Sequence, residues 1–129
     1  MKLTENEISI MNLFWSSGVP LSAQDIVKQC EDKKWKASSI NILLNSLLSK
    51  GAIEVTGLQR NGKHYSRTFI NCISKEDYYV QTITDYVAVD NKLIRKMTCA
   101  LVQNETISDE TILYLEHLLN EAKKNRGLS

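Results

Sequence analysis

Residues 35–69 read WKASSINILLNSLLSKGAIEVTGLQRNGKHYSRTF, and this stretch decides the fold. Apolar residues recur at helical spacing across residues 37–50, which predicts a helix with one buried stripe. The opposite face carries short side chains that hydrogen-bond without a formal charge, namely Ser38, Ser39, Asn41, Asn45 and Ser46. Solvated helix faces more often carry Glu and Lys, so this face suits the edges of DNA bases.

A short strand, a polar turn and a second strand follow this helix. Gly51 ends the helix, residues 53–56 alternate as a strand, and residues 65–70 return as its partner. Between the strands, Asn61 and Gly62 form the strongest hairpin signal in the chain. The stretch therefore predicts a recognition helix followed by a β-wing.

Two further helices are predicted ahead of the recognition helix from their capping residues. Two pairs have a hydroxyl that caps the first turn and an acid three residues on that reaches back: Thr4 with Glu7, and Ser22 with Asp25. They predict helices over residues 5–15 and over 23 to about 32. Three helices followed by a β-hairpin form a winged helix-turn-helix, whose third helix lies in the major groove while the wing touches phosphates.

The exposed face of the predicted recognition helix suits A·T base pairs. Asn41 and Asn45 lie one turn apart, and each amide can form a bidentate contact to an adenine edge. Ile42 can meet a thymine methyl group, and this face has no Arg for the usual contact to guanine. An ordinary solvated helix surface stays open as the alternative for Asn41 and Asn45 taken together, and for Ser38, Ser39 and Ile42 taken singly.

Basic side chains are placed where they can hold phosphates beside the groove. They are Lys36 and Lys50 at the two ends of the recognition helix, and Arg60, Lys63, His64 and Arg67 in the wing. For His64, a solvated wing residue is an equal alternative. Residues 1–72 carry a net charge of +3 and residues 73–129 carry −2, so the positive charge lies with the predicted DNA-binding part. Scattered charge that only keeps the protein in solution is the alternative for these residues. Because winged helices also dock proteins, a docking module without sequence-specific DNA binding is the alternative function.

The composition changes after residue 72, and three more helices are predicted. They span residues 75–90, residues 92–103 and a last segment that begins after Ser108. We expect a mainly α protein with a small β-hairpin, in which residues 1–72 form the winged-helix DNA-binding domain and residues 73–129 form a three-helix dimerisation domain.

The last helix has apolar residues around more than half of its circumference, and a single packing seam cannot cover them. A second copy of the chain would cover them. The expected dimer contacts are Tyr79, Ile83, Tyr86, Leu93, Met97, Leu101, Ile112, Leu115, Leu118 and Leu119. A monomer whose last helix packs back on the winged helix is the alternative.

Length and composition limit the class of protein. A chain of 129 residues with 43% apolar residues has room for one small domain and an oligomerisation module. The N-terminus is too acidic for a signal peptide and no apolar run is long enough to span a bilayer, so we expect a cytoplasmic protein. The three cysteines, Cys30, Cys72 and Cys99, are expected as reduced and mostly buried thiols.

The sequence gives little support for an enzyme. His64 and His117 are the two histidines, and neither has a Cys, Asp or Glu at a spacing typical of a metal or catalytic cluster. A glycine-rich phosphate loop is also lacking. We therefore expect no catalytic residue, no metal and no cofactor, with double-stranded DNA and a second copy of the chain as the partners.

Seven stretches of the chain, taken in order, carry a family resemblance. They are Leu3-Thr4-Glu5-Asn6-Glu7 with Met11, Phe14 and Trp15; Trp35-Lys36-Ala37-Ser38-Ser39-Ile40; Leu44-Asn45-Ser46-Leu47; Lys50-Gly51-Ala52-Ile53; Gly62-Lys63-His64-Tyr65; Ser74-Lys75-Glu76-Asp77-Tyr78; and Ser108-Asp109-Glu110 with Leu115. In order and spacing the chain resembles the penicillinase and methicillin-resistance repressors of Gram-positive bacteria, whose relatives include copper-responsive repressors.

The resemblance implies a homodimeric repressor with an N-terminal winged helix and a C-terminal dimerisation region, bound to a pseudo-palindromic operator. In the type members, a membrane sensor with a metalloprotease domain responds to β-lactam and triggers cleavage of the repressor at an Asn-Phe bond. The matching position here reads Met97-Thr98-Cys99-Ala100-Leu101-Val102, which makes Ala100-Leu101 the candidate bond for that or another protease.

Two further departures from the family pattern limit what the resemblance implies. The copper-responsive relatives end in paired Cys-x-Cys motifs, whereas this chain ends AKKNRGLS, so a metal switch of that type is not expected. Ala37 stands where the family usually has a proline, and Ser38 stands where it often has a lysine. A different operator sequence is therefore expected.

Overall fold

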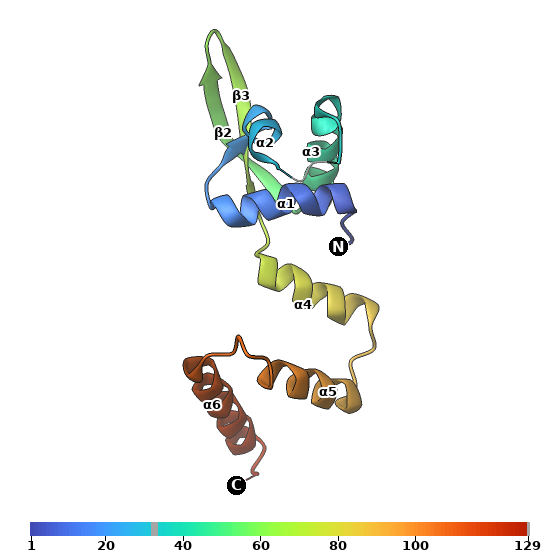
Figure 1. The fold of residues 1–129 in the computed structure, drawn as a ribbon, viewed down its shortest axis with the longest axis vertical. Helices are drawn as coiled ribbons and strands as arrows, with labels where there is room; N and C mark the ends of the chain where they lie inside the picture. The colour runs from blue at the N-terminus through green and yellow to red at the C-terminus, as the bar shows by residue number, and fades with distance from the viewer. Residues whose placement is uncertain (32–33, 129) are drawn as a thin grey trace. The chain divides into compact units, whose positions relative to one another are not determined.

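The computed structural model describes residues 1–31 and 34–128. Its elements are, in chain order, α1 (Glu5–Ser17), β1 (Leu21–Ser22), α2 (Ala23–Gln29), the 3₁₀ turn η1 (Ala37–Ser39), α3 (Ile40–Ser49), β2 (Ile53–Asn61), β3 (His64–Asn71), α4 (Lys75–Tyr86), α5 (Asn91–Val102) and α6 (Asp109–Asn125). They divide into two compact units, Met1–Val87 and the residues from Ala88 onward. The first unit contains the three helices and the hairpin of a winged helix-turn-helix, and helices follow it, which confirms the predicted fold class (Figure 1).

The predicted caps start the first two helices. Thr4 Oγ1 accepts from the Glu7 backbone N–H at 3.2 Å, and Glu7 Oε1 accepts from the Thr4 N–H at 2.8 Å. Ser22 and Asp25 form the same reciprocal pair at the start of α2. Each pair satisfies backbone donors that the first helical turn leaves without a partner.

Both helices of the helix-turn-helix differ in extent from the prediction. α2 ends at Gln29 because Cys30 is extended, with φ −77° and ψ 106°; residue 32, where the prediction ended, lies outside the described residues. The third helix begins as the 3₁₀ turn η1 and becomes α-helical at Ile40. The first exposed residues of the predicted recognition helix therefore lie on a tighter turn than the rest.

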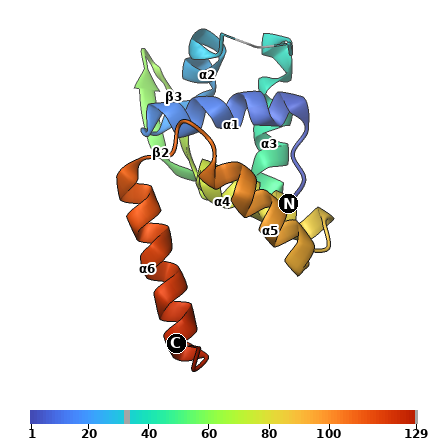
Figure 2. The same ribbon diagram turned by 60° about the horizontal axis from the view of Figure 1, so that its bottom comes forward.

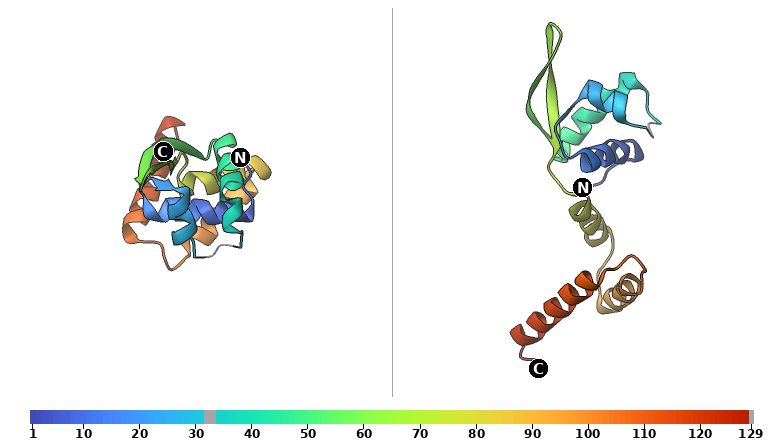
Figure 3. Two further views of the ribbon diagram at one scale, coloured as in Figure 1. Left: turned by 90° about the horizontal axis from the view of Figure 1, so that it is seen from above. Right: turned by 60° about the vertical axis from the view of Figure 1, so that its left-hand side comes forward.

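The sheet contains three antiparallel strands in the order β1-β3-β2, with Leu21 and Val55 both opposite Phe69. β2 runs further than the predicted strand and carries a bulge at Thr56. Asn61 pairs with His64, so Gly62 and Lys63 are the two turn residues, and Gly62 has φ 63°. The predicted turn is thus confirmed one residue further along, and the hairpin of β2 and β3 projects beyond α2 (Figure 1 and Figure 3, right).

One hydrophobic core joins the helices of the first unit to the base of the sheet. Its buried members are Leu3, Ile10, Met11, Phe14, Leu21, Ile26, Cys30, Trp35, Ile40, Leu44, Leu47, Ala52, Ile53, Phe69 and Tyr78. The predicted stripe of α3 supplies three of them, which fixes the opposite side of that helix toward solvent.

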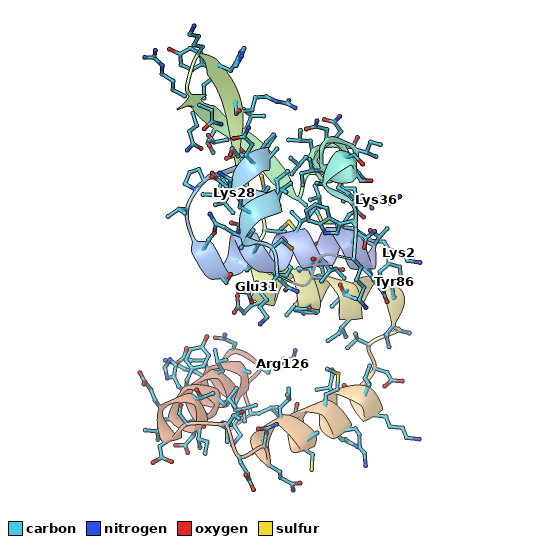
Figure 4. All side chains as sticks on the ribbon, turned by 45° about the horizontal axis from the view of Figure 1, so that its top comes forward. Lys2, Lys28, Glu31, Lys36, Tyr86 and Arg126 are labelled. Carbon is cyan, nitrogen blue, oxygen red and sulfur yellow. The ribbon has the colours of Figure 1, made fainter. Side chains whose placement is uncertain are left out.

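α4 packs on the winged helix, on the other side of α1 from α2 (Figures 1 and 2). Trp15 Nε1 donates a 2.8 Å hydrogen bond to the Ile73 carbonyl, and the Trp15 ring lies 5.7 Å from the ring of buried Tyr78. At the far end of α4, the N-terminal amine lies 3.5 Å from Asp85 Oδ2, consistent with the neighbouring Lys2 and Tyr86 in Figure 4. The boundary expected after residue 72 therefore falls inside the first compact unit.

The second unit contains the two other predicted C-terminal helices, and α4 stops earlier than expected. Val87 is extended, and the Asp90 carboxylate accepts from the Leu93 N–H at 2.8 Å, so Asp90 caps α5 instead of ending α4. Ser108 caps α6 in the same way. None of the described residues from Ala88 onward is buried, although α5 and α6 both carry an apolar face.

Candidate nucleic-acid interface

The solvent side of α3 carries Asn41, Ile42 and Asn45. Ile40, Leu44 and Leu47 are buried on the opposite side, so the helical repeat turns these three outward together. Ile42 is 72% exposed, so its branched side chain is open to a ligand. The surface offers two amides and one branched apolar side chain to a ligand, with no charge among them.

The serines around this face divide into two groups. Ser38 is exposed on η1 and Ser39 is half-buried beside it. Ser46 was expected on the free face, but that prediction is wrong, because its hydroxyl donates a 2.7 Å hydrogen bond to Glu7 Oε2. Ser49 is exposed and lies one turn after Asn45, so it shares the stripe of Asn41 and Asn45. The 41, 45, 49 spacing could have identified Ser49 from the sequence.

Lys50 does not project freely toward solvent as a phosphate contact requires. Its Nζ lies 2.6 Å from Glu7 Oε1, and the Glu7 side chain is 2% exposed. Burial raises the pKa of Glu7, but the Lys50 ammonium, the Thr4 backbone N–H and the Ser46 hydroxyl outweigh it and hold the pKa below the ordinary 4.5. The cation at the end of the recognition helix is therefore paired inside the fold.

The lowered pKa of Glu7 predicts an acid-labile contribution to folding. The ionised carboxylate stabilises the fold fully above pH 4.5, and this stabilisation is lost as the pH falls through the lowered pKa of the folded protein. Urea unfolding of the wild-type protein and of Glu7→Gln, measured from about pH 7 down to pH 3, checks this. The difference in unfolding free energy between them should shrink as the pH falls, and a constant difference would contradict the assignment.

The wing holds its cations in different ways. Lys63 and His64 are exposed at the turn. Arg60 donates from Nε to the Gly62 carbonyl at 3.0 Å, which restrains its guanidinium beside the turn. Arg67 lies lower on the hairpin, with Cζ 5.2 Å from the centroid of the buried Phe69 ring. All four side chains are exposed, so each keeps donors available to an anion.

Two apolar residues of the wing were missed by the sequence reasoning. Leu58 is directly opposite Arg67 and Tyr65 is directly opposite Arg60, so the four share one face of the hairpin. Leu58 is 69% exposed and Tyr65 is 65% exposed. The bulge at Thr56 shifts the alternation of β2, which hides this pattern in the sequence.

Other exposed lysines lie on the helical part of the first unit. Lys36 precedes η1 and Lys28 lies on α2, and both are exposed (Figure 4). With the wing, they extend the positive charge to both sides of α3. This pattern is typical of surfaces that track a phosphate backbone.

The expected dimer residues lie on α4, α5 and α6. On α4, Tyr86 is exposed and Ile83 is half-buried, whereas the Tyr79 ring lies 6.3 Å from Trp15 and 5.2 Å from Tyr78. The others are exposed or half-buried in the second unit: Leu93, Met97, Leu101, Ile112, Leu115, Leu118 and Leu119. Ala100 and Leu101, the candidate cleavage bond, are both exposed in the last turn of α5.

The three thiols are free, but the expectation that most are buried is wrong. Cys30 is buried and lies 3.2 Å from Ser9 Oγ, whereas Cys72 and Cys99 are exposed. Partial burial raises the pKa of Cys72, and the charge of Glu54 and a hydrogen bond with it raise it further. Within residues 1–31 and 34–128 there is no metal-binding cluster of His, Cys, Asp and Glu, and no helix has the length and hydropathy to cross a bilayer.

Comparison with known proteins covers nearly the whole chain. An uncharacterized 16.5 kDa protein from the ptsI 3' region of Latilactobacillus sakei is 24% identical over 120 residues, which span 92% of this chain and 78% of that protein. The sequence model of the penicillinase repressor family matches residues 3–121, from the start of α1 into α6. Members of that family are DNA-binding transcriptional regulators and not enzymes. On this match, which includes both the winged helix and the C-terminal helices, the chain belongs to the penicillinase repressor family.

Proposed function

We propose that this protein is a homodimeric transcriptional repressor that places α3 of each protomer in the major groove of a pseudo-palindromic operator. The observation that carries the proposal is the uncharged, exposed face of α3, with Asn41, Ile42 and Asn45 on one side of the helix. Amides suit adenine edges, and an isoleucine suits a thymine methyl group. Ser38, Ser39 and Ser49 extend this face, and the wing and Lys36 contact the phosphates beside the groove.

The second unit supports the dimer. The described residues from Ala88 onward include none that is buried, so α5 and α6 do not cover each other's apolar faces within the second unit. A second copy covers them symmetrically and sets two recognition helices about one DNA turn, or a multiple of it, apart. Bound repressor then blocks polymerase at the promoter. We therefore expect the protein to act in the cytoplasm, where the DNA is.

Release from the operator by proteolysis at Ala100-Leu101 stays a prediction of the resemblance. The protease would be a membrane sensor metalloprotease or another protease, and the trigger would be a β-lactam or cell-envelope signal. The bond lies in the exposed last turn of α5, where a helix frays most readily. Cleavage there would separate α6 from the rest of the chain. The dimer would weaken, and mass action would empty the operator.

Selection from random DNA tests the proposed function without assuming an operator. Full-length protein selects duplexes from a library with a random region of about 30 base pairs, and the affinity for the selected duplex is compared with that for its scrambled version at about 150 mM salt. We expect a two-fold symmetric sequence and a preference of about a thousandfold. Weak binding that is indifferent to sequence would contradict the proposal and favour a protein-docking winged helix.

Replacing Lys63 tests the role of the wing. We expect Lys63→Ala to weaken binding to the selected and scrambled duplexes alike and to reduce the slope of log affinity against log salt by about one per protomer. Lys2→Ala is the matched control, since Lys2 is an exposed lysine beside α4, on the far side of α1 from α2. An unchanged slope for Lys63→Ala would place the wing away from the phosphates.

A further inference from the structure

Glu7 joins the start of α1 to the end of the recognition helix. Its Oε1 accepts from the Thr4 N–H at 2.8 Å and from Lys50 Nζ at 2.6 Å, while its Oε2 accepts from Ser46 Oγ at 2.7 Å. Ser46 and Lys50 lie 39 and 43 residues away in the chain. One buried carboxylate therefore holds Ser46 of α3 and Lys50, the C-cap residue of α3, at once.

These bonds add a directional restraint to the apolar packing of α3. Ile40, Leu44 and Leu47 are buried in the core, but apolar contacts are non-directional and tolerate small rotations of a helix about its axis. Hydrogen bonds weaken steeply away from their preferred angle. The carboxylate of Glu7 therefore supplies the directional restraint on α3.

The restraint lies close to the residues that face DNA. Ser46 follows Asn45 directly, and both belong to the same ten-residue helix, so a rotation of the helix about its axis moves both side chains. A rotation of about 10° displaces a side-chain end that lies roughly 6 Å from the helix axis by about 1 Å. A bidentate amide contact to a base does not survive such a displacement, because a site has to be held to within about 0.5 Å.

We propose that Glu7 is a positioning residue for base recognition, which sets the rotation of α3 through Ser46 and Lys50, and that Lys50 serves this carboxylate and not a phosphate. The inference rests on the proposed function and deepens it. Glu7 itself is 1% exposed, which leaves it no surface for a contact of its own with DNA. Its effect on DNA binding is therefore confined to discrimination between sequences.

The test measures discrimination and salt dependence together. Glu7→Gln keeps the size of the side chain but removes the charge that pairs with Lys50. We expect it to lower the ratio of affinities for the selected and scrambled duplexes by about tenfold, the scale of one disrupted base contact. Its salt slope should stay that of the wild type, because no phosphate contact is removed. Glu5→Gln, an exposed acid in the same helical turn, should change neither quantity.

A second variant removes both charges, since a buried ion pair replaced as a whole costs less stability than one broken by removing a single partner. Glu7→Gln combined with Lys50→Met should be folded by circular dichroism, show the same loss of discrimination and keep the wild-type salt slope. It also replaces Glu7→Gln in the comparison if the single variant is unfolded.

The outcomes separate the inference from the proposed function. An unchanged affinity ratio in the folded variants, with lower thermal stability alone, would overturn the positioning role. A salt slope reduced by about one per protomer in the double variant would overturn the assignment of Lys50. Wild-type protein that shows no preference for any duplex would overturn the proposed function, and the inference with it.

Discussion

Replacing Leu115 with aspartate is expected to separate the dimer and leave the winged helix folded. Leu115 is half-buried on α6 and shares its apolar face with Ile112, Leu118 and Leu119. A charge at this position would be desolvated without a partner in the interface, which costs several kcal/mol in typical cases. A monomer engages one half-site only, so operator affinity should fall by about a hundredfold or more.

Light scattering after size exclusion measures the mass of the variant, and circular dichroism reports its folding. His117→Asp is the matched control, because it adds the same charge on the nearly opposite face of α6. We expect a monomer for Leu115→Asp and a dimer for both His117→Asp and the wild type. A dimer for Leu115→Asp would contradict the proposed interface. A monomeric wild type would favour the alternative in which α6 packs back on the winged helix of its own chain.

Replacing Asn45 with alanine is expected to weaken the selected duplex by about 1–3 kcal/mol and to relax discrimination at one base position. Asn45 is exposed in the middle of the α3 face, so the loss comes from its amide and not from packing. Binding to the scrambled duplex should stay unchanged, because the phosphate contacts are intact.

Mobility shift against duplexes with single base changes measures this effect. Asn12→Ala is the matched control, since Asn12 is an exposed asparagine on α1 outside the α3 face. Equal losses of Asn45→Ala on selected and scrambled duplexes would count against base readout by this side chain. The same result would remove the main support for sequence-specific binding through α3.

The elements fixed by local chemistry could be predicted from the sequence. The reciprocal caps at Thr4 and Ser22 place the starts of α1 and α2, because a cap needs only residues three positions apart. The two-residue turn around Gly62 follows from the same kind of short-range preference. The exposed face of α3 follows from helical spacing alone.

The features that depend on contacts between distant residues could not be predicted. Ser46 has the spacing of a solvent-facing serine, but its hydroxyl donates a hydrogen bond to Glu7 of α1 and does not face solvent freely. Lys50 likewise pairs with Glu7. β1 is two residues long and exists because Leu21 pairs with Phe69. Tyr79 has the spacing of an interface residue, and its contact with Trp15 depends on how α4 packs against α1.

The packing of α4 against α1 would separate two properties of the proposed operator. α4 is held to the DNA-binding unit by Trp15, Ile73 and Tyr78, so the first non-helical joint after it spans residues 87–90. In the proposed complex, base preference would be set on α3, whereas the distance between half-sites would depend on this joint and on the helices beyond it. In that complex, insertions or deletions at residues 87–90 would change the half-site spacing that the dimer accepts. Each protomer would keep its preference for the same half-site sequence.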